Sequence, residues 1–260
     1  MKSDSVTFEN IICGCPWVLN VENKTSPNED RYTWRHNNVL RVLCNAIIHK
    51  VQQCNADNHK NNISGIDFVK EKASTTTINT VTAKIQSKRK TFYGDLTGAN
   101  ALIVFFELPE LKEFSIKHFP QDICQTKKEV DAFVISQSRK ICLVGPELTV
   151  PIEERIAFWN AYEKKTGKYE KMIADHGSPS WKLKCIVAEV GCRGYIPPSF
   201  RKALQHFGFT SKELKKLVDE CSLVSRRSSY YIWLKRFHQS FIPFQMVQID
   251  IAAYKSIAVV

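Results

Sequence analysis

Long apolar runs are missing from this sequence of 260 residues. No stretch approaches the roughly 20 apolar residues that a transmembrane helix needs. The opening Met-Lys-Ser-Asp-Ser also lacks the apolar segment of a secretion signal. We therefore expect a protein of the nucleus or the cytoplasm that is neither secreted nor embedded in a membrane.

Several enzyme motifs are missing too. The sequence holds no Gly-x-x-x-x-Gly-Lys phosphate loop, no Rossmann fingerprint and no Gly-x-Ser-x-Gly nucleophile elbow. It shows no internal repeat. We expect no small-molecule substrate and no nucleotide cofactor bound through these motifs.

The nine cysteines follow no regular spacing, and their number is odd. Without a secretion signal, they are best interpreted as reduced thiols. Cys13, Cys15 and His36 would make a poor zinc set, because Cys-x-Cys is an unusual spacing and Cys44 or a distant residue would have to complete it. We expect buried thiols in place of zinc.

The charge balance favours a polyanionic partner. Lysine and arginine outnumber the acids, which gives a formal net charge of +11. Charge alone does not distinguish DNA from RNA or a membrane surface. Hydrophobic residues at 43% and charged residues at 24% are typical of a folded globular protein.

The pattern predicts an N-terminal segment over residues 1–55, a polar linker over 56–90, a main domain over 91–238 and a tail over 239–260. In the first segment, the spacing of Val39, Leu43 and Ile47 predicts a helix over about 38–54. In the main domain, the expected order is a strand at 101–106, two strands joined by the turn 136–139, a helix over 151–175, a strand at 181–190, a short helix from Pro197, and a helix opened by the capping box Thr210-x-x-Glu213. The 151–175 helix should bury one face that carries Ile152, Ile156, Trp159, Tyr162, Tyr169 and Ile173. The tail suggests an added strand.

Two acids stand at the ends of the paired strands. Asp131 opens the first strand and Glu147 lies near the end of the second. A hairpin would hold these carboxylates at one end of the sheet, where they suit a hard divalent cation such as Mg²⁺ or Mn²⁺. The apolar setting of Glu147 is one in which a carboxylate needs a partner. The competing interpretation is two solvated strand-end acids.

Lysines follow on the next predicted helix. Lys165 falls at the margin of its apolar face and Lys168 further round. Either ammonium could reach the acids and stabilise charge on a phosphate, and Lys165 has the better geometry. Four further residues are candidate nucleic-acid contacts: Arg31, Arg35 and His36 before the first helix, and Arg193 in the loop 191–194.

An ordered series of motifs then resembles a known family, the restriction-like endonuclease region downstream of the reverse transcriptase in non-LTR retrotransposon polyproteins. The resemblance covers about residues 7–236. It rests on the segments at 31–41, 98–100, 119–126, 147–151, 165–169, 189–194 and 232–236.

The resemblance implies a PD-(D/E)XK nuclease, an α/β fold with a mixed sheet flanked by helices and an N-terminal helical segment. It implies Mg²⁺- or Mn²⁺-dependent nicking of DNA at a target site, with Asp131 and Glu147 as metal ligands and Lys165 or Lys168 as the catalytic lysine. Thr149 stands where the family has its usual lysine. Cys15 matches the last cysteine of a zinc-binding motif whose histidine falls at Asn10, so we do not expect zinc here.

Two other functions stay open. The chain could be a catalytically inactive remnant that binds DNA, or RNA of the parent element, through the same basic surface. A regulatory or protein-binding domain is a third class, and it would show an apolar surface patch without converging acids.

Overall fold

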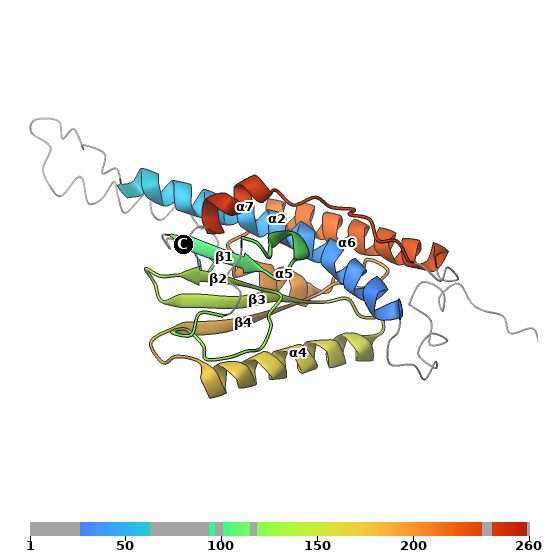
Figure 1. Cartoon of the computed structure of the whole chain (residues 1–260), viewed down its shortest axis with the longest axis horizontal. Coiled ribbons are helices and arrows are strands. Elements are labelled where there is room, and N and C mark those ends of the chain that lie inside the picture. Colours follow the sequence, from blue (N-terminus) through green and yellow to red (C-terminus); the bar gives the residue numbers. More distant parts are fainter. Residues whose placement is uncertain (1–26, 63–93, 97–100, 115–118, 236–240, 259–260) are drawn as a thin grey trace, which may run out of the picture.

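The computed structural model describes residues 27–62, 94–96, 101–114, 119–235 and 241–258. Within this part, four strands form one sheet that is flanked by five α-helices, one of them N-terminal (Figure 1). The fold class is therefore mixed α/β. The strands are β1 (Leu102–Phe106), β2 (Ala132–Ser136), β3 (Ile141–Thr149) and β4 (Lys182–Glu189); the helices are α2 (Pro27–Asn62), the 3₁₀ helix η2 (Pro109–Leu111), α4 (Arg155–His176), α5 (Pro198–Gln205), α6 (Ser211–Leu234) and α7 (Ile251–Ala258).

The strands follow the order β1-β2-β3-β4. β1, β2 and β3 are antiparallel neighbours, whereas β3 and β4 are parallel, so the sheet is mixed. The predicted hairpin is confirmed, because Ser136 pairs with Ile141 across the turn. Helix α4 supplies the crossover that two parallel neighbours require.

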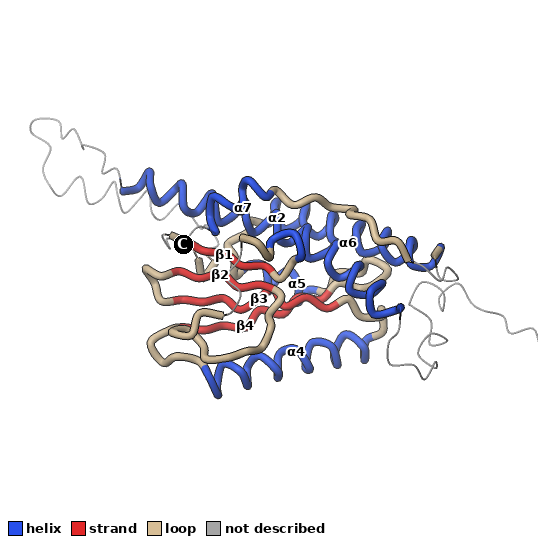
Figure 2. The backbone as a smooth tube through the Cα atoms, in the orientation of Figure 1, coloured by secondary structure: helices blue, strands red, loops and turns tan. Residues whose placement is uncertain are grey.

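The sheet is covered on both faces, because successive strand residues point to opposite sides. On one face, Phe133 and Val144 pack with Tyr169 and Met172 of α4. On the other face, β-strand residues such as Val134 join a larger core with α2, α5, α6 and α7. Figure 2 shows the strands as a layer between α4 and the helices α2, α6 and α7.

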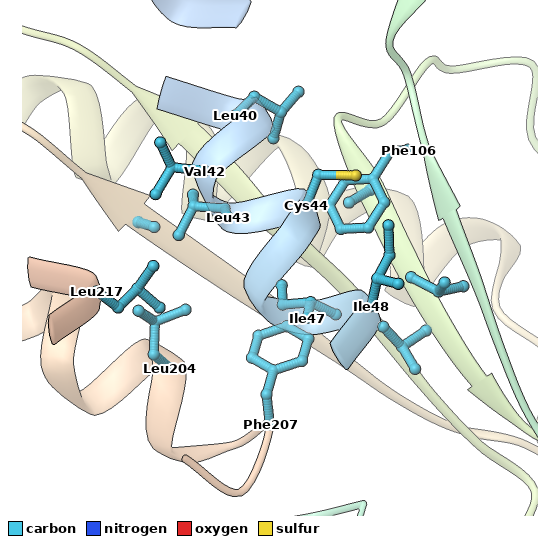
Figure 3. Close-up of a cluster of buried hydrophobic side chains, with 14 of the residues drawn as sticks. Leu40, Val42, Leu43, Cys44, Ile47, Ile48, Phe106, Leu204, Phe207 and Leu217 are labelled. Carbon is cyan, nitrogen blue, oxygen red and sulfur yellow. The ribbon is translucent and has the colours of Figure 1, made fainter. Parts of the chain in front are cut away.

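Helix α2 lies at the centre of the larger core. Leu40, Leu43 and Ile47 are fully buried at helical spacing, against side chains that include Phe106 and Phe207 (Figure 3). The helix is longer than the predicted 38–54, and residues 56–62 of the predicted linker belong to it. Residues 63–90 of that linker lie outside the described residues. Residues 27–55 of the predicted N-terminal segment thus share their core with the sheet through α2.

The predicted buried face of α4 is wrong for its first two turns. Ile156 and Trp159 are 72% and 64% exposed, and the buried side chains are Tyr169 and Met172. Only the second half of the helix packs on the sheet face that carries Phe133 and Val144. The helix also begins at Arg155, four residues after the predicted start at Pro151.

The predicted tail strand is wrong as well. Residues 251–258 form α7, whose Tyr254 and Ile257 enter the larger core. The Asp250 carboxylate accepts a hydrogen bond from the Ala253 backbone N–H at 2.9 Å, as a helix-opening residue does. The weak alternation of apolar residues before Asp250 suggested a strand. The hydrogen bond of the Asp250 carboxylate and the helical spacing of the apolar residues after it favour a helix instead.

The remaining predicted elements of the main domain are confirmed. α5 begins at Pro198, and the capping box of α6 is formed by both of its reciprocal bonds between Thr210 and Glu213. The seven described cysteines form no disulfide. Among the described helices, none combines the length and the apolar character that crossing a membrane demands.

Candidate active site

The hairpin brings Asp131 and Glu147 together. Asp131 directly precedes β2, and Glu147 lies in β3 after a bulge that shifts the register with β4 between Val144 and Glu147. Each carboxylate accepts a hydrogen bond from a backbone N–H at or next to the other acid. The Asp131 N–H donates to Glu147 Oε1 at 2.9 Å, and the Leu148 N–H donates to Asp131 Oδ2 at 2.8 Å.

Gly145 allows the bulge of β3 to form directly beside β4. Its φ of +131° is a conformation that side-chain-bearing residues rarely adopt. An added Cβ would lie 2.2 Å from the Ile186 carbonyl oxygen of β4. Only glycine allows this close approach, and the bulge then re-aims the following residues toward the site.

Lys165 connects the two acids. Its ammonium lies 3.1 Å from Asp131 Oδ2 and 3.2 Å from Glu147 Oε2. Lys168, the alternative lysine, instead donates to the Tyr169 hydroxyl at 3.2 Å and is exposed. The geometry therefore selects Lys165 as the lysine of the acid pair.

His36 is also at this site, although it was predicted as a nucleic-acid contact. Its Nε2 lies 3.4 Å from Asp131 Oδ2. The residue comes from α2, far away in the sequence, and no local pattern relates it to Asp131. Tyr169 completes the buried side of the site, because its hydroxyl contacts Glu147 and donates to the Glu129 carbonyl oxygen at 3.2 Å.

The environment moves the pKa values of the two acids apart. Glu147 is fully buried, and burial together with the nearby Asp131 charge raises its pKa to about 7, although Lys165 opposes this. Burial alone would raise the pKa of Asp131, but the hydrogen bond and charge of His36 and the charge of Lys165 lower it to about 2. Asp131 is thus anionic at neutral pH, while Glu147 exchanges a proton near neutrality.

The two cationic side chains beside the acids, His36 and Lys165, hold their protons more strongly than usual. Burial lowers the pKa of both His36 and Lys165. Asp131 and the Asn37 hydrogen bond outweigh burial for His36, and the two carboxylates outweigh it for Lys165, so each pKa lies above its ordinary value. Positive charge is therefore held next to Asp131. Separated pKa values in neighbouring groups are a feature of functional sites.

The donor set fits a hard divalent cation. Two carboxylates converge on one point, which the Lys165 ammonium takes in this structure. The described residues contact the Asp131 carboxylate through Oδ2 alone, which leaves Oδ1 for a ligand. Within the described ranges, no group of three or more His, Cys, Asp and Glu side chains has the arrangement of a complete metal cluster. Backbone oxygens, water or substrate would have to complete the coordination.

The other predicted nucleic-acid contacts are engaged with the protein. Arg35 is 6% exposed and donates to Ser229 Oγ at 3.0 Å and to the Val150 carbonyl at 3.3 Å. Arg31 is equally buried, with its guanidinium 5.3 Å from the centre of the Phe241 ring. Arg193 donates to Glu153 Oε2 at 3.3 Å.

The structure therefore gives these arginines packing and bridging roles, and their phosphate contacts stay predictions. Cys13 and Cys15 lie outside the described residues. Comparisons with protein-family models, with characterised proteins and with solved structures find no significant match for this chain.

Proposed function

We propose that this protein is a metal-dependent DNA endonuclease that hydrolyses phosphodiester bonds at the Asp131–Glu147–Lys165 site. One observation carries the proposal: two carboxylates from a single hairpin converge on one cationic group at the end of the sheet. An arrangement that holds an ammonium between a fully buried acid and a partly exposed one can also hold Mg²⁺ or Mn²⁺.

The residues have separate roles in the proposed reaction. Asp131 and Glu147 would hold the cation, which when bound supplies an activated water and stabilises charge on the phosphate. Lys165 then turns its ammonium to the attacking water or to a non-bridging phosphate oxygen. His36 keeps Asp131 ionised and oriented, and the backbone N–H of Leu148 fixes the same oxygen.

The arrangement of the strands around the two acids supports the same proposal. A mixed sheet with one acid before a strand and another within its antiparallel neighbour is what the resemblance to restriction-like endonucleases implies. We therefore propose a restriction-endonuclease-like fold and a nuclear site of action, where DNA is found. The net charge of +11 suits a DNA partner.

The second candidate is a nucleic-acid-binding protein without catalysis. One observation favours it, namely that the Lys165 ammonium bridges both carboxylates in an ion pair network. A chain that had lost its chemistry would keep such a pair as a structural ion bridge. Its DNA binding would depend on salt and not on a divalent cation.

Nicking of supercoiled plasmid distinguishes the two functions. Wild type should nick in Mg²⁺ or Mn²⁺, whereas Asp131→Asn and Glu147→Gln should lose cleavage while they still bind DNA. Lys168→Met serves as the matched control and should cleave like the wild type. Salt-sensitive binding without nicking in any variant would establish the binder.

A further inference from the structure

Helix α6 packs beside α2 and presents a basic face outward (Figure 1). Its opposite face is apolar and carries Leu214, Leu217 and Cys221 into the larger core. The exposed cations of the helix share the outward face, and they are Lys212, Lys215, Lys216, Arg226 and Arg227. At 1.5 Å per residue, these cations extend over about 22 Å of the helix axis.

Two exposed acids lie between the lysines and the arginines of this face. They are Asp219 and Glu220, and Glu220 Oε1 lies 3.7 Å from the Lys216 ammonium. After Glu220 the helix carries no acidic residue. Arg226 and Arg227 form no ion pair with any other residue that the structure describes. The second half of α6 therefore offers two guanidinium groups to an anion.

The elements that border this half of the helix do not reverse its charge. On one flank, Glu153 and Arg193 pair with each other at 3.3 Å, in the region where Ser225 contacts the loop after β4. On the other flank, α2 contributes the exposed Asp30, and Lys235 follows the last residue of α6. The two arginines therefore leave the surface with a net positive charge.

An exposed aromatic pair follows the two arginines. Tyr230 comes four residues after Arg226, so the two side chains lie on adjoining turns of one face. Tyr230 is 51% exposed, and its ring stacks on Trp233 with 5.6 Å between ring centres. Guanidinium and phenol groups both donate hydrogen bonds to phosphate oxygens. This combination suits the sugar–phosphate backbone of a nucleic acid.

This part of α6 is joined to the acid pair through α2. Ser229 Oγ accepts a hydrogen bond from Arg35 at 3.0 Å, and the same guanidinium donates to the Val150 carbonyl, directly after β3. The neighbouring His36 lies 3.4 Å from Asp131 Oδ2. A DNA backbone that is bound at the acids would therefore continue toward the second half of α6.

We propose that the second half of α6 binds the phosphate backbone of duplex DNA beside the scissile bond, through Arg226, Arg227 and Tyr230. The inference rests on the proposed function for the identity of its ligand. Each arginine contacts one phosphate, and Tyr230 donates its hydroxyl to the same strand. Contacts of this kind position DNA without selecting a base sequence.

The buried side of α6 favours DNA over an anionic membrane as the partner. A helix that lies on a membrane inserts its apolar face into the lipid. The apolar face of α6 is already packed in the protein core, so the helix has only its charged face to offer. A charged, outward face next to a proposed nuclease site matches a phosphate backbone.

The test measures the affinity for a DNA duplex at several salt concentrations in EDTA, so that no cleavage is required. Each phosphate contact contributes about 0.9 to the slope of log K against log salt concentration. Arg226→Gln and Arg227→Gln should each flatten this slope by about 0.9, and the double variant by about 1.8. Tyr230→Phe removes a neutral donor, so it should bind about threefold more weakly with an unchanged slope.

Arg139→Gln is the matched control. It removes one exposed arginine from the turn between β2 and β3, at the end of the sheet away from Asp131, and it should keep the wild-type slope. An equal change for Arg139→Gln and Arg226→Gln, or a double variant with the wild-type slope, would overturn the inference.

Binding to vesicles that contain phosphatidylserine tests the competing partner. A double variant that loses vesicle binding and keeps wild-type DNA binding would overturn the inference in favour of a membrane surface. If the wild type nicks no plasmid but the double variant flattens the slope, the nuclease proposal fails and the DNA-binding surface of α6 stands. If the wild type nicks plasmid and the slope does not change, only the surface is wrong.

Discussion

At the scale of single residues, Lys165 is the group on which the site depends most. Its ammonium compensates two carboxylates, one of which is fully buried. Removing one partner of a buried ionic cluster leaves uncompensated charge, which is more costly than losing a surface pair.

Lys165→Met should therefore destabilise the protein by about 2–4 kcal/mol at pH 8. The loss should be smaller at pH 5, where Glu147 holds a proton and the acid pair carries less charge. Urea unfolding at both pH values measures this effect. Lys168→Met is the matched control. An equal loss of stability in both variants would show that the Lys165 ammonium does not stabilise the acid pair.

Glu147 gives the site a second signature, in the dependence of stability on pH. Its folded pKa of about 7 is above its unfolded value, so the folded protein takes up a proton. This contribution to stability is fully present below the unfolded pKa and is lost as the pH rises through about 7.

Glu147→Gln removes this titration while it keeps the shape of the side chain. Between pH 5.5 and 8.5, the free energy of unfolding of the wild type should fall relative to that of the variant by on the order of 1–3 kcal/mol. Chemical unfolding at several pH values reports the difference. Parallel curves for the two proteins would mean that Glu147 titrates in the ordinary range.

At the scale of elements, α6 depends on its first turn. Thr210 Oγ1 accepts from the Glu213 N–H, and the Glu213 carboxylate accepts in turn from the Thr210 N–H. Thr210→Ala should cost about 1 kcal/mol of stability, because a helix-opening donor loses its partner. Ser211→Ala, a change at the next residue, should stay near the wild type in thermal unfolding. The cap is unimportant if both variants unfold alike.

Helix α7 ties the end of the described chain to the core. Tyr254 is fully buried among residues of α2 and β1. Tyr254→Ala should lose about 3–5 kcal/mol through the cavity it creates. Exchange of the exposed Lys255 for alanine should cost much less in the same unfolding experiment. A small effect of Tyr254→Ala would show that α7 is a loosely attached appendage.

Elements that are defined by neighbouring residues could be predicted from the sequence. The hairpin of β2 and β3 has a local turn and alternating apolar residues, so the convergence of Asp131 and Glu147 followed from it. The capping box likewise predicted the start of α6. The position of Lys165 followed from helical spacing once α4 was expected.

Features that depend on packing between distant segments could not be predicted. His36 meets Asp131 because α2 crosses the end of the sheet, and no pattern around either residue encodes this. The exposure of Trp159 depends on where the apolar face of the sheet stops beneath α4. The burial of Arg35 is set by α6 and by the end of β3, which supply its acceptors.

At the scale of the whole molecule, the acid pair is assembled from three separate parts of the fold. The sheet holds the acids and α4 carries Lys165. His36 links α2 to the same point. A change in the packing of α2 or α4 would therefore alter the site without touching its acids.

The most direct test of metal-dependent cleavage is a single-turnover assay on bound DNA, with wild type and Glu147→Gln in excess over an intact duplex substrate. In Mg²⁺ or Mn²⁺, the wild type should cleave at least about 100-fold faster than Glu147→Gln, because the variant loses one of the two proposed metal ligands and, with it, charge stabilisation. Equal rates for the two proteins, or no cleavage by wild type that binds DNA fully, would contradict a nuclease centred on Asp131 and Glu147.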